Sequence, residues 1–175
     1  MLALVLVMLA GPGPSLGDDI AAYARSKLGQ KVGNGECTSL AVEALRHCGA
    51  RQPDPAAGVW GQPLSSLRDV QPGDILQLEG AVFVQQRARD GGGVITTTTR
   101  YPHHTAVVES VRRRGSRPVL VILHQNAGAA GTAGDELKIV QQGTLDLAAK
   151  RAGKITAYRA LAALPEQPAG ERRRP

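Results

Sequence analysis

The chain has 175 residues, of which 42% are apolar and only 3% are aromatic. This length suits a single domain with a substantial aliphatic core, and the composition excludes a chain that is disordered throughout. The net charge of +6 comes partly from arginine runs at 112–117 and 172–174. These runs contain no interleaved aromatic residues and no recognition motif for DNA or RNA. They therefore predict a solvated turn and a frayed end rather than nucleic-acid binding.

The amino-terminal residues are typical of a targeting segment. MLALVLVMLA is a short apolar run that GPGPSLG interrupts, and Ser15 and Gly17 form a small-x-small pattern before Asp18. The run is too short to span a bilayer. We therefore predict a signal peptide over residues 1–17, export to the periplasm or the outside of the cell, and no stable membrane insertion after processing. The alternatives are a wrongly assigned start site or a short buried strand.

Two helices are expected first in chain order. One runs from Asp18 to Leu28, with Gly29 as its stop, and the next from near Cys37 to about Cys48. Eleven residues of one helix rise about 16 Å, whereas a disulfide needs Cα atoms within about 7 Å. Both cysteines are therefore expected to be free thiols.

Strand patterns follow a Pro-rich loop. The turn at Pro72 and Gly73 precedes a strand that residues 81–86 either extend or follow. Gly91 to Gly93 predict the bend of an exposed hairpin or flexible insertion. Helices followed by antiparallel strands indicate an α+β domain over residues 18–162, and residues 163–175 are expected to be a disordered basic tail. Further strands are expected at 104–111, 118–126 and 154–161, with a shorter one within 137–148.

Cys37 is the residue with the clearest chemical potential. It follows Gly35 and Glu36 at the expected start of a helix, where unpaired N–H groups and the helix dipole favour a thiolate. A backbone N–H there could also stabilise an oxyanion. The alternative is a small buried cysteine in an ordinary helix.

A nucleophilic cysteine needs a base, and two adjacent histidines begin the strand HTAVVESV. Strand alternation puts His104 on the face of Ala106 and Val108, and His103 on the opposite face. Only one of them can face Cys37, and we predict His104. In the next strand His124 and Asn126 share a face, and either could orient the base; for each, the alternative is a solvated strand end.

These segments resemble a known superfamily. GNGECTSLAVEALRHCGA, VQPGDILQL, HTAVVESV and ILHQN are similar to the nucleophile helix and following strands of the CHAP and NlpC-type, papain-like cysteine peptidases. A related branch, the cysteine-proteinase-fold domain of fungal actin-patch proteins, resembles the chain in its Gly-Glu-Cys start, His-Thr-Ala strand and Gln-Asn pair.

The resemblance implies a papain-like fold with amino-terminal helices packed on an antiparallel sheet. It also implies that Cys37 is the nucleophile, His104 the base, and His124 or Asn126 the orienting residue. The function that follows is hydrolysis of an amide bond through a thioester, in a peptide or peptidoglycan-like substrate. The alternative is a non-catalytic binding or scaffold module on the same fold.

Other residues near Cys37 are candidates for substrate contacts. Glu36 is one such candidate, and its alternative role is capping or a solvated position. Trp60 is another, and its alternative role is packing in the core or at its rim. Zinc binding by Cys37 and the histidines lacks the usual ligand spacing, so we expect no metal and no cofactor, and a monomer. The candidate substrate-binding residues are Gly35, Glu36, Trp60 and His103.

Overall fold

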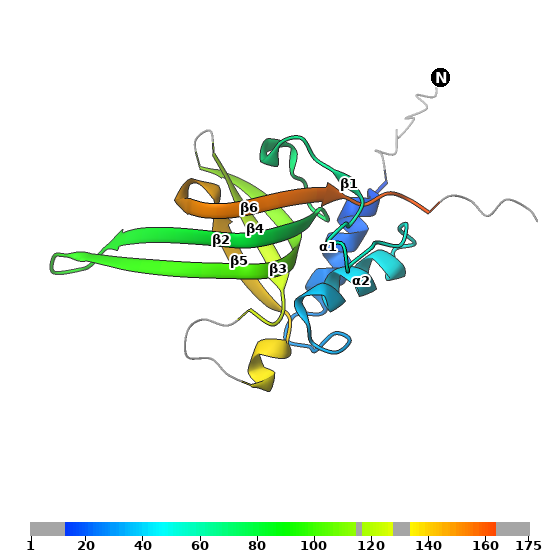
Figure 1. The fold of residues 1–175 in the computed structure, drawn as a ribbon, viewed down its shortest axis with the longest axis horizontal. Helices are drawn as coiled ribbons and strands as arrows, with labels where there is room; N and C mark the ends of the chain where they lie inside the picture. The colour runs from blue at the N-terminus through cyan, green and yellow to red at the C-terminus, as the bar shows by residue number, and fades with distance from the viewer. Residues whose placement is uncertain (1–12, 115–116, 128–133, 164–175) are drawn as a thin grey trace, which may run out of the picture.

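The computed structural model describes residues 13–114, 117–127 and 134–163. In these residues two α-helices precede one antiparallel sheet of six strands in the order β1-β6-β2-β3-β4-β5 (Figure 1). The predicted α+β architecture is therefore confirmed. No described helix is long and apolar enough to cross a membrane. The predicted tail lies outside the described residues, except for Ala163.

Helix α1 spans Leu16–Ser26 and begins two residues before the predicted start at Asp18. The reason is a capping box: Ser15 Oγ accepts from the Asp18 N–H, and the Ser15 N–H donates to Asp18 Oδ2. Gly17 packs tightly, since a Cβ there would lie 2.6 Å from the carbonyl oxygen of Pro72. Cleavage after residue 17 stays a prediction, and it would remove both Ser15 and Gly17.

Helix α2 spans Cys37–His47 and begins at Cys37, as predicted. Gly49, with a φ of 65°, follows the helix in the left-handed conformation that commonly ends helices. Cys37 and Cys48 are both free thiols, which confirms the argument from helix length. Four residues of α2 are buried and face the sheet: Leu40, Ala41, Ala44 and Leu45.

The sheet is dominated by one long hairpin. Residues 81–86 extend the strand that starts at Ile75. Residues 94–103 continue directly into the strand predicted at 104–111, so these two segments form one strand. Short 3-10 turns occur at Leu67–Asp69, Asp135–Lys138 and Leu147–Ala149. The strands are β1 (Gln62–Pro63), β2 (Ile75–Ala88), β3 (Val94–Arg114), β4 (Arg117–His124), β5 (Gln141–Asp146) and β6 (Lys150–Arg159).

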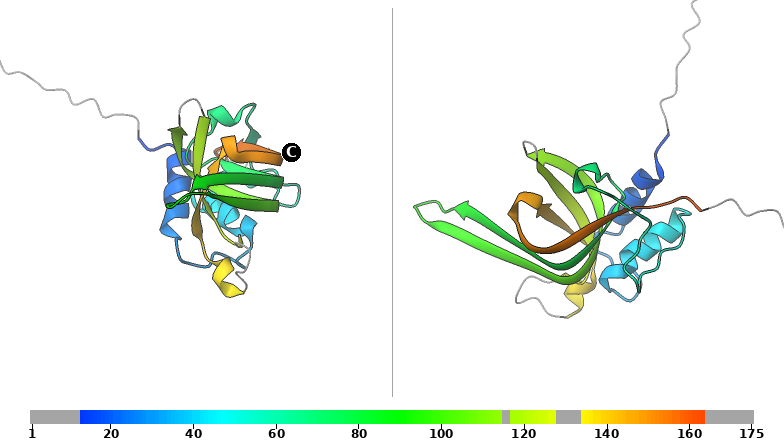
Figure 2. Two further views of the ribbon diagram at one scale, coloured as in Figure 1. Left: turned by 90° about the vertical axis from the view of Figure 1, so that its left-hand side faces the viewer. Right: turned by 45° about the horizontal axis from the view of Figure 1, so that its top comes forward.

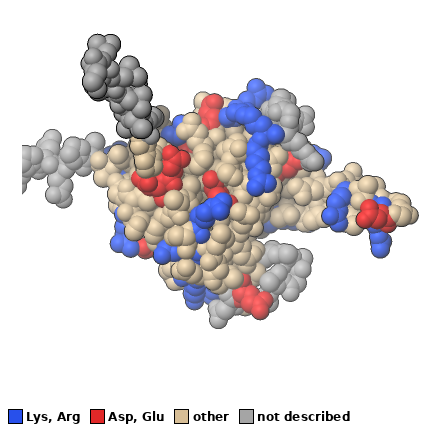
Figure 3. Space-filling view, turned by 180° about the vertical axis from the view of Figure 1, so that it is seen from behind, with Lys and Arg blue, Asp and Glu red and all other residues tan. Residues whose placement is uncertain are grey.

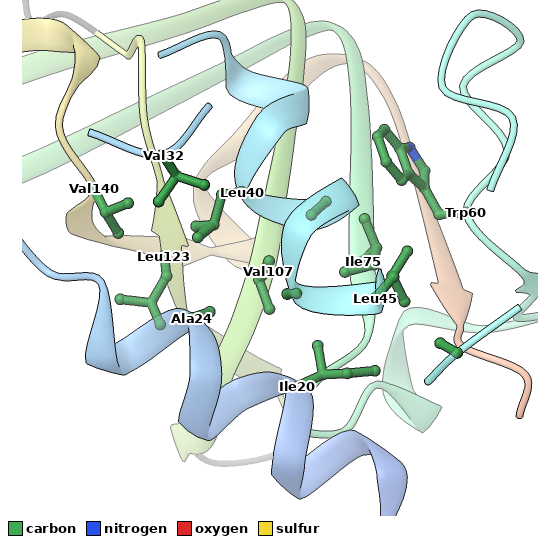
Figure 4. Packing of buried hydrophobic residues seen from close by; sticks show 13 residues of the cluster. Ile20, Ala24, Val32, Leu40, Leu45, Trp60, Ile75, Val107, Leu123 and Val140 are labelled. Carbon is green, nitrogen blue, oxygen red and sulfur yellow. The ribbon is translucent and has the colours of Figure 1, made fainter. Parts of the chain in front are cut away.

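Each face of the central sheet covers its own core. On one face, which we call the helix-side core, Ile75, Val107 and Leu123 pack against the two helices (Figure 4). On the other face, which we call the second core, Ala106 and Val108 pack with residues of β2, β4, β5 and β6. Since successive strand residues point to opposite faces, parity in β3 decides which core each side chain enters.

An ion pair between the partly exposed Arg159 and the buried carboxylate of Asp74 joins the start of β2 to the end of β6. Asp74 is 2% exposed, and the Arg159 guanidinium donates to both of its carboxylate oxygens, at 3.1 and 3.0 Å. The Gln71 N–H also donates to Asp74, at 2.8 Å. Because the Asp74 carboxylate is largely shielded from water, loss of the Arg159 guanidinium would leave a buried charge without its partner.

We predict that Arg159→Met lowers the free energy of unfolding by about 2 kcal/mol, because it leaves the Asp74 carboxylate buried and unpaired. Urea denaturation measures this change. The matched control is Lys154→Met on the same strand, which removes an exposed pair with Glu79 at 3.9 Å and should cost at most about 0.5 kcal/mol. Equal effects of the two substitutions would contradict the prediction.

Candidate functional site

Cys37 is the first residue of α2, where backbone N–H groups lack helical partners. Glu36 is the N-cap residue, but its side chain makes no capping hydrogen bond. The loop before it turns through Gly33 and Gly35, whose φ angles of 56° and 86° favour glycine. The half-buried thiol thus lies at a helix amino terminus, as the sequence predicted.

Gln125 holds the loop before Cys37, a role that the sequence did not reveal. Its buried side chain accepts from the Val32 N–H at 3.2 Å and donates to the carbonyls of Val32 and Glu36 at 2.9 and 2.8 Å. These bonds tie the end of β4 to the start of α2. Only the three-dimensional structure reveals the tie, since the partners lie about ninety positions apart in the chain.

Asn126 is turned toward Glu36. Its φ of 55° is left-handed, and its side-chain N–H donates to Glu36 Oε2 at 2.7 Å. The sequence prediction assumed that the strand continues through Asn126, whereas β4 ends at His124. The amide is therefore used on Glu36, and no described hydrogen bond joins it to His104.

His104 and His124 form a buried pair. They are 3% and 6% exposed, and His104 Nε2 lies 3.0 Å from His124 Nδ1, so one ring supplies the N–H and the other accepts it. Their rings meet edge to face, and Tyr101 stacks on His104 with centroids 5.1 Å apart. The sequence left the neighbour of His104 open between His124 and Asn126, and the structure has His124 there.

Burial makes both rings resist protonation. It is the main cause that lowers the pKa of His104 to about 3, with a further contribution from His124. Burial alone lowers the pKa of His124 to about 4. The two rings are therefore neutral near pH 7, as a pair with one shared N–H requires.

The prediction that His104 faces Cys37 is wrong about the face of the sheet. Parity was assigned correctly, since His104 shares its face with Ala106 and Val108, but that face belongs to the second core. The helices cover the face of Val107. His103, and not His104 as predicted, shares the face of Val107 that the helices cover.

His103 is held by a hydrogen-bonded chain that starts at Trp60. The Trp60 indole N–H donates to Gln77 Oε1 at 3.0 Å, and the Thr105 hydroxyl donates to the same oxygen at 3.0 Å. Gln77 Nε2 lies 3.1 Å from His103 Nε2.

The Trp60 end of this chain fixes the proton positions. Indole N–H can only donate, so the oxygen of Gln77 must face Trp60 and its NH2 must face His103. His103 Nε2 is then the acceptor, and a neutral His103 carries its proton on Nδ1. A catalytic histidine with its Nε2 turned to an orienting residue would instead carry an N–H there and need an acceptor.

The remaining candidates have structural roles. Trp60 is 1% exposed and is a core residue, so its predicted contact with substrate is not supported. A Cβ on Gly35 would lie 2.7 Å from the Cβ of Lys138, so that glycine allows close packing of the chain on itself. Within the described residues no group of three or more His, Cys, Asp or Glu side chains could hold a metal ion.

The contacts of the thiol and of the histidine rings can be compared directly. In the described residues no hydrogen bond joins Cys37 to an imidazole, and the hydrogen bonds that involve histidine rings are those with Gln77 and within the His104–His124 pair. The thiol thus lies beside the first N–H groups of α2, and the ring nitrogens that make these hydrogen bonds have partners other than Cys37.

Two amino-terminal helices on an antiparallel sheet, with cysteine opening the second helix, define a papain-like cysteine-proteinase fold. The AIM3/BBC1 cysteine proteinase-fold domain matches residues 9–164, and the chain belongs to this family. The resemblance to the fungal branch of the papain-like superfamily is thereby confirmed.

One relative is altered inheritance of mitochondria protein 3 of Debaryomyces hansenii. It is 30% identical over 164 residues, and the match covers 84% of this chain. The chain spans 16% of the length of that relative. No solved structure matches the chain.

The histidine pair predicts acid sensitivity. Unfolding returns each ring to a pKa near 6.5, so below that pH the unfolded chain binds protons that the folded chain refuses. Stability is thus fully present above about pH 6.5 and is lost as pH falls toward 4. We expect the free energy of unfolding to drop by ~2–4 kcal/mol between pH 7 and pH 5.

Urea titrations at several pH values measure this drop. Exposed His47 is the matched control position, and the same titrations are made on His47→Gln. A stability that is flat between pH 7 and pH 5 would show that the pair is not buried in neutral form.

Proposed function

We propose that this domain is a non-catalytic binding module built on the cysteine-proteinase fold. The observation that carries the proposal is the series of hydrogen bonds from Trp60 through Gln77 to His103. It presents an amide donor to Nε2 of His103, the histidine on the helix side. An imidazolium that pairs with a thiolate through one nitrogen needs an acceptor at its other nitrogen. Because Gln77 offers a donor to Nε2, these hydrogen bonds favour a His103 that does not activate Cys37.

The use of the other two histidines supports the same proposal. His104 and His124 occupy positions that the papain-like resemblance assigns to the base and its orienting residue, yet they are buried against Tyr101. They bond to each other on the face away from the helices. Side chains with this burial contribute to the second core, and their mutual bond occupies Nε2 of His104 and Nδ1 of His124.

A cysteine hydrolase is the second candidate, and the start of α2 is the observation that favours it. Cys37 is half-buried rather than enclosed, and Glu36 leaves the first turn without a side-chain cap. Free N–H groups at this end could stabilise a thiolate and then an oxyanion. For cleavage of an amide bond, including one in a peptidoglycan-like peptide, His103 would have to accept the thiol proton, and the Gln77 amide would have to turn so that its oxygen faces His103 Nε2.

Thiol reactivity separates the two candidates. For a binding module, we predict that iodoacetamide alkylates Cys37 at a rate that changes less than about twofold in His103→Ala or His104→Ala, because neither ring activates the thiol. For a hydrolase, removal of the true base should slow alkylation about tenfold or more near neutral pH. The rate is followed by mass spectrometry of peptides that contain Cys37.

The second thiol of the chain provides an internal control. Cys48 is half-buried at the end of α2, and burial raises its pKa, so its rate should be the same in all variants. Fast alkylation of Cys37 that is lost in His103→Ala, together with turnover of a peptide amide that is lost in Cys37→Ala, would overturn the proposal.

A further inference from the structure

The outer part of the β2–β3 hairpin projects from the body of the domain (Figures 1 and 2). We call residues 84–100 the arm; it contains the ends of both strands and the turn between them. Strand β6 pairs with β2 only as far as Phe83, and β4 pairs with β3 only from Val107 onward. Every residue from Gln85 to Arg100 is exposed.

A hairpin of two strands that is bare on both faces is marginally stable, and three or more strands are needed for independent stability. In the described residues no further strand pairs with the arm, so each of its strands has one open edge of unpaired N–H and C=O groups.

The two open edges differ in chemistry. The β2 side carries Arg87 and leads into Arg89 and Asp90 at the turn, and charges of this kind discourage edge pairing. Figure 3 shows charged side chains gathered near the outer end of the arm. Residues Val94 to Thr99 on β3 are six consecutive β-branched residues without charge, proline or glycine, and Val94 and Ile95 are 63% and 40% exposed. Such a segment favours strand pairing.

We infer that this edge of β3 pairs antiparallel with the same edge of a second copy of the chain, forming a continuous four-stranded sheet from two arms. The chain itself supplies the neutral, β-branched strand that the edge fits, and Thr–Thr pairs across strands are stabilising. The inference is independent of the proposed function, and it departs from the monomer that the sequence led us to expect.

Symmetry limits the register of this pairing. A two-fold axis perpendicular to the sheet keeps every side chain on its own face, and directly opposed residues share a face. A residue can therefore oppose only its own copy or one an even number of positions away. With Thr97 opposite Thr97 of the second copy, every residue from Ile95 to Thr99 meets an uncharged partner.

Charge exchange at Thr97 tests the inference in the whole chain. Sedimentation equilibrium from micromolar to millimolar concentrations should show that the unmodified chain dimerises. Thr97→Lys and Thr97→Glu should each weaken dimerisation about tenfold or more, since like charges directly opposite repel. An equimolar mixture of the two variants should restore dimers, because lysine then faces glutamate.

Gln85→Lys is the matched control. Gln85 is the β2 partner of Thr97 and shares its face, but two copies of residue 85 would lie three strand spacings, about 14 Å, apart. This exceeds the screening length of about 8 Å at physiological salt, so dimerisation should change by less than about twofold.

Unchanged melting temperatures would confirm that these exposed substitutions preserve the fold. A chain that stays monomeric at millimolar concentration overturns the inference, as does a mixture of the Thr97 variants that fails to associate. An edge that binds only a strand from another protein would give the first of these results.

Discussion

The structure depends on the burial of strand β3 on both faces. Val107 lies in the helix-side core and its neighbours Ala106 and Val108 lie in the second core, so no residue near the middle of the strand can change face without exposing one core. This constraint extends to the histidines that precede them. It puts His103 with the helices and His104 with His124, and thereby decides which imidazole can approach α2.

The sequence predicted the elements better than it predicted the orientation of the site. The extent of α2 and the free thiols follow from local signals such as Gly35, Gly49 and helix length. Strand pairing left the neighbour of His104 open between His124 and Asn126, and only the structure selects His124. The choice of face failed because HTAVVESV is apolar on both faces. Periodicity cannot rank two faces that are both buried, and the helices that distinguish them are far away in the chain.

Contacts between distant residues explain what the sequence could not reveal. Gln125 reaches back to Val32, and Gln77 connects Trp60 to His103. Glutamine at these positions gives no local pattern, and for the single tryptophan the sequence favoured packing but left a cleft wall open. Both glutamines are buried with their amide oxygens and nitrogens bonded, and such buried polar groups make the surrounding arrangement specific. The cysteine-proteinase fold thus carries three histidines on β3 and β4 that are bonded to Gln77 or to each other.

The proton position on His103 tests this account most directly. A long-range proton–nitrogen correlation spectrum at neutral pH reports which ring nitrogens of each histidine carry protons. The account predicts that His103 carries a proton on Nδ1 and none on Nε2, which accepts from Gln77, and that Cys37→Ala leaves this pattern unchanged. A doubly protonated His103 that loses one proton in Cys37→Ala would reveal a thiolate–imidazolium pair and would contradict the account.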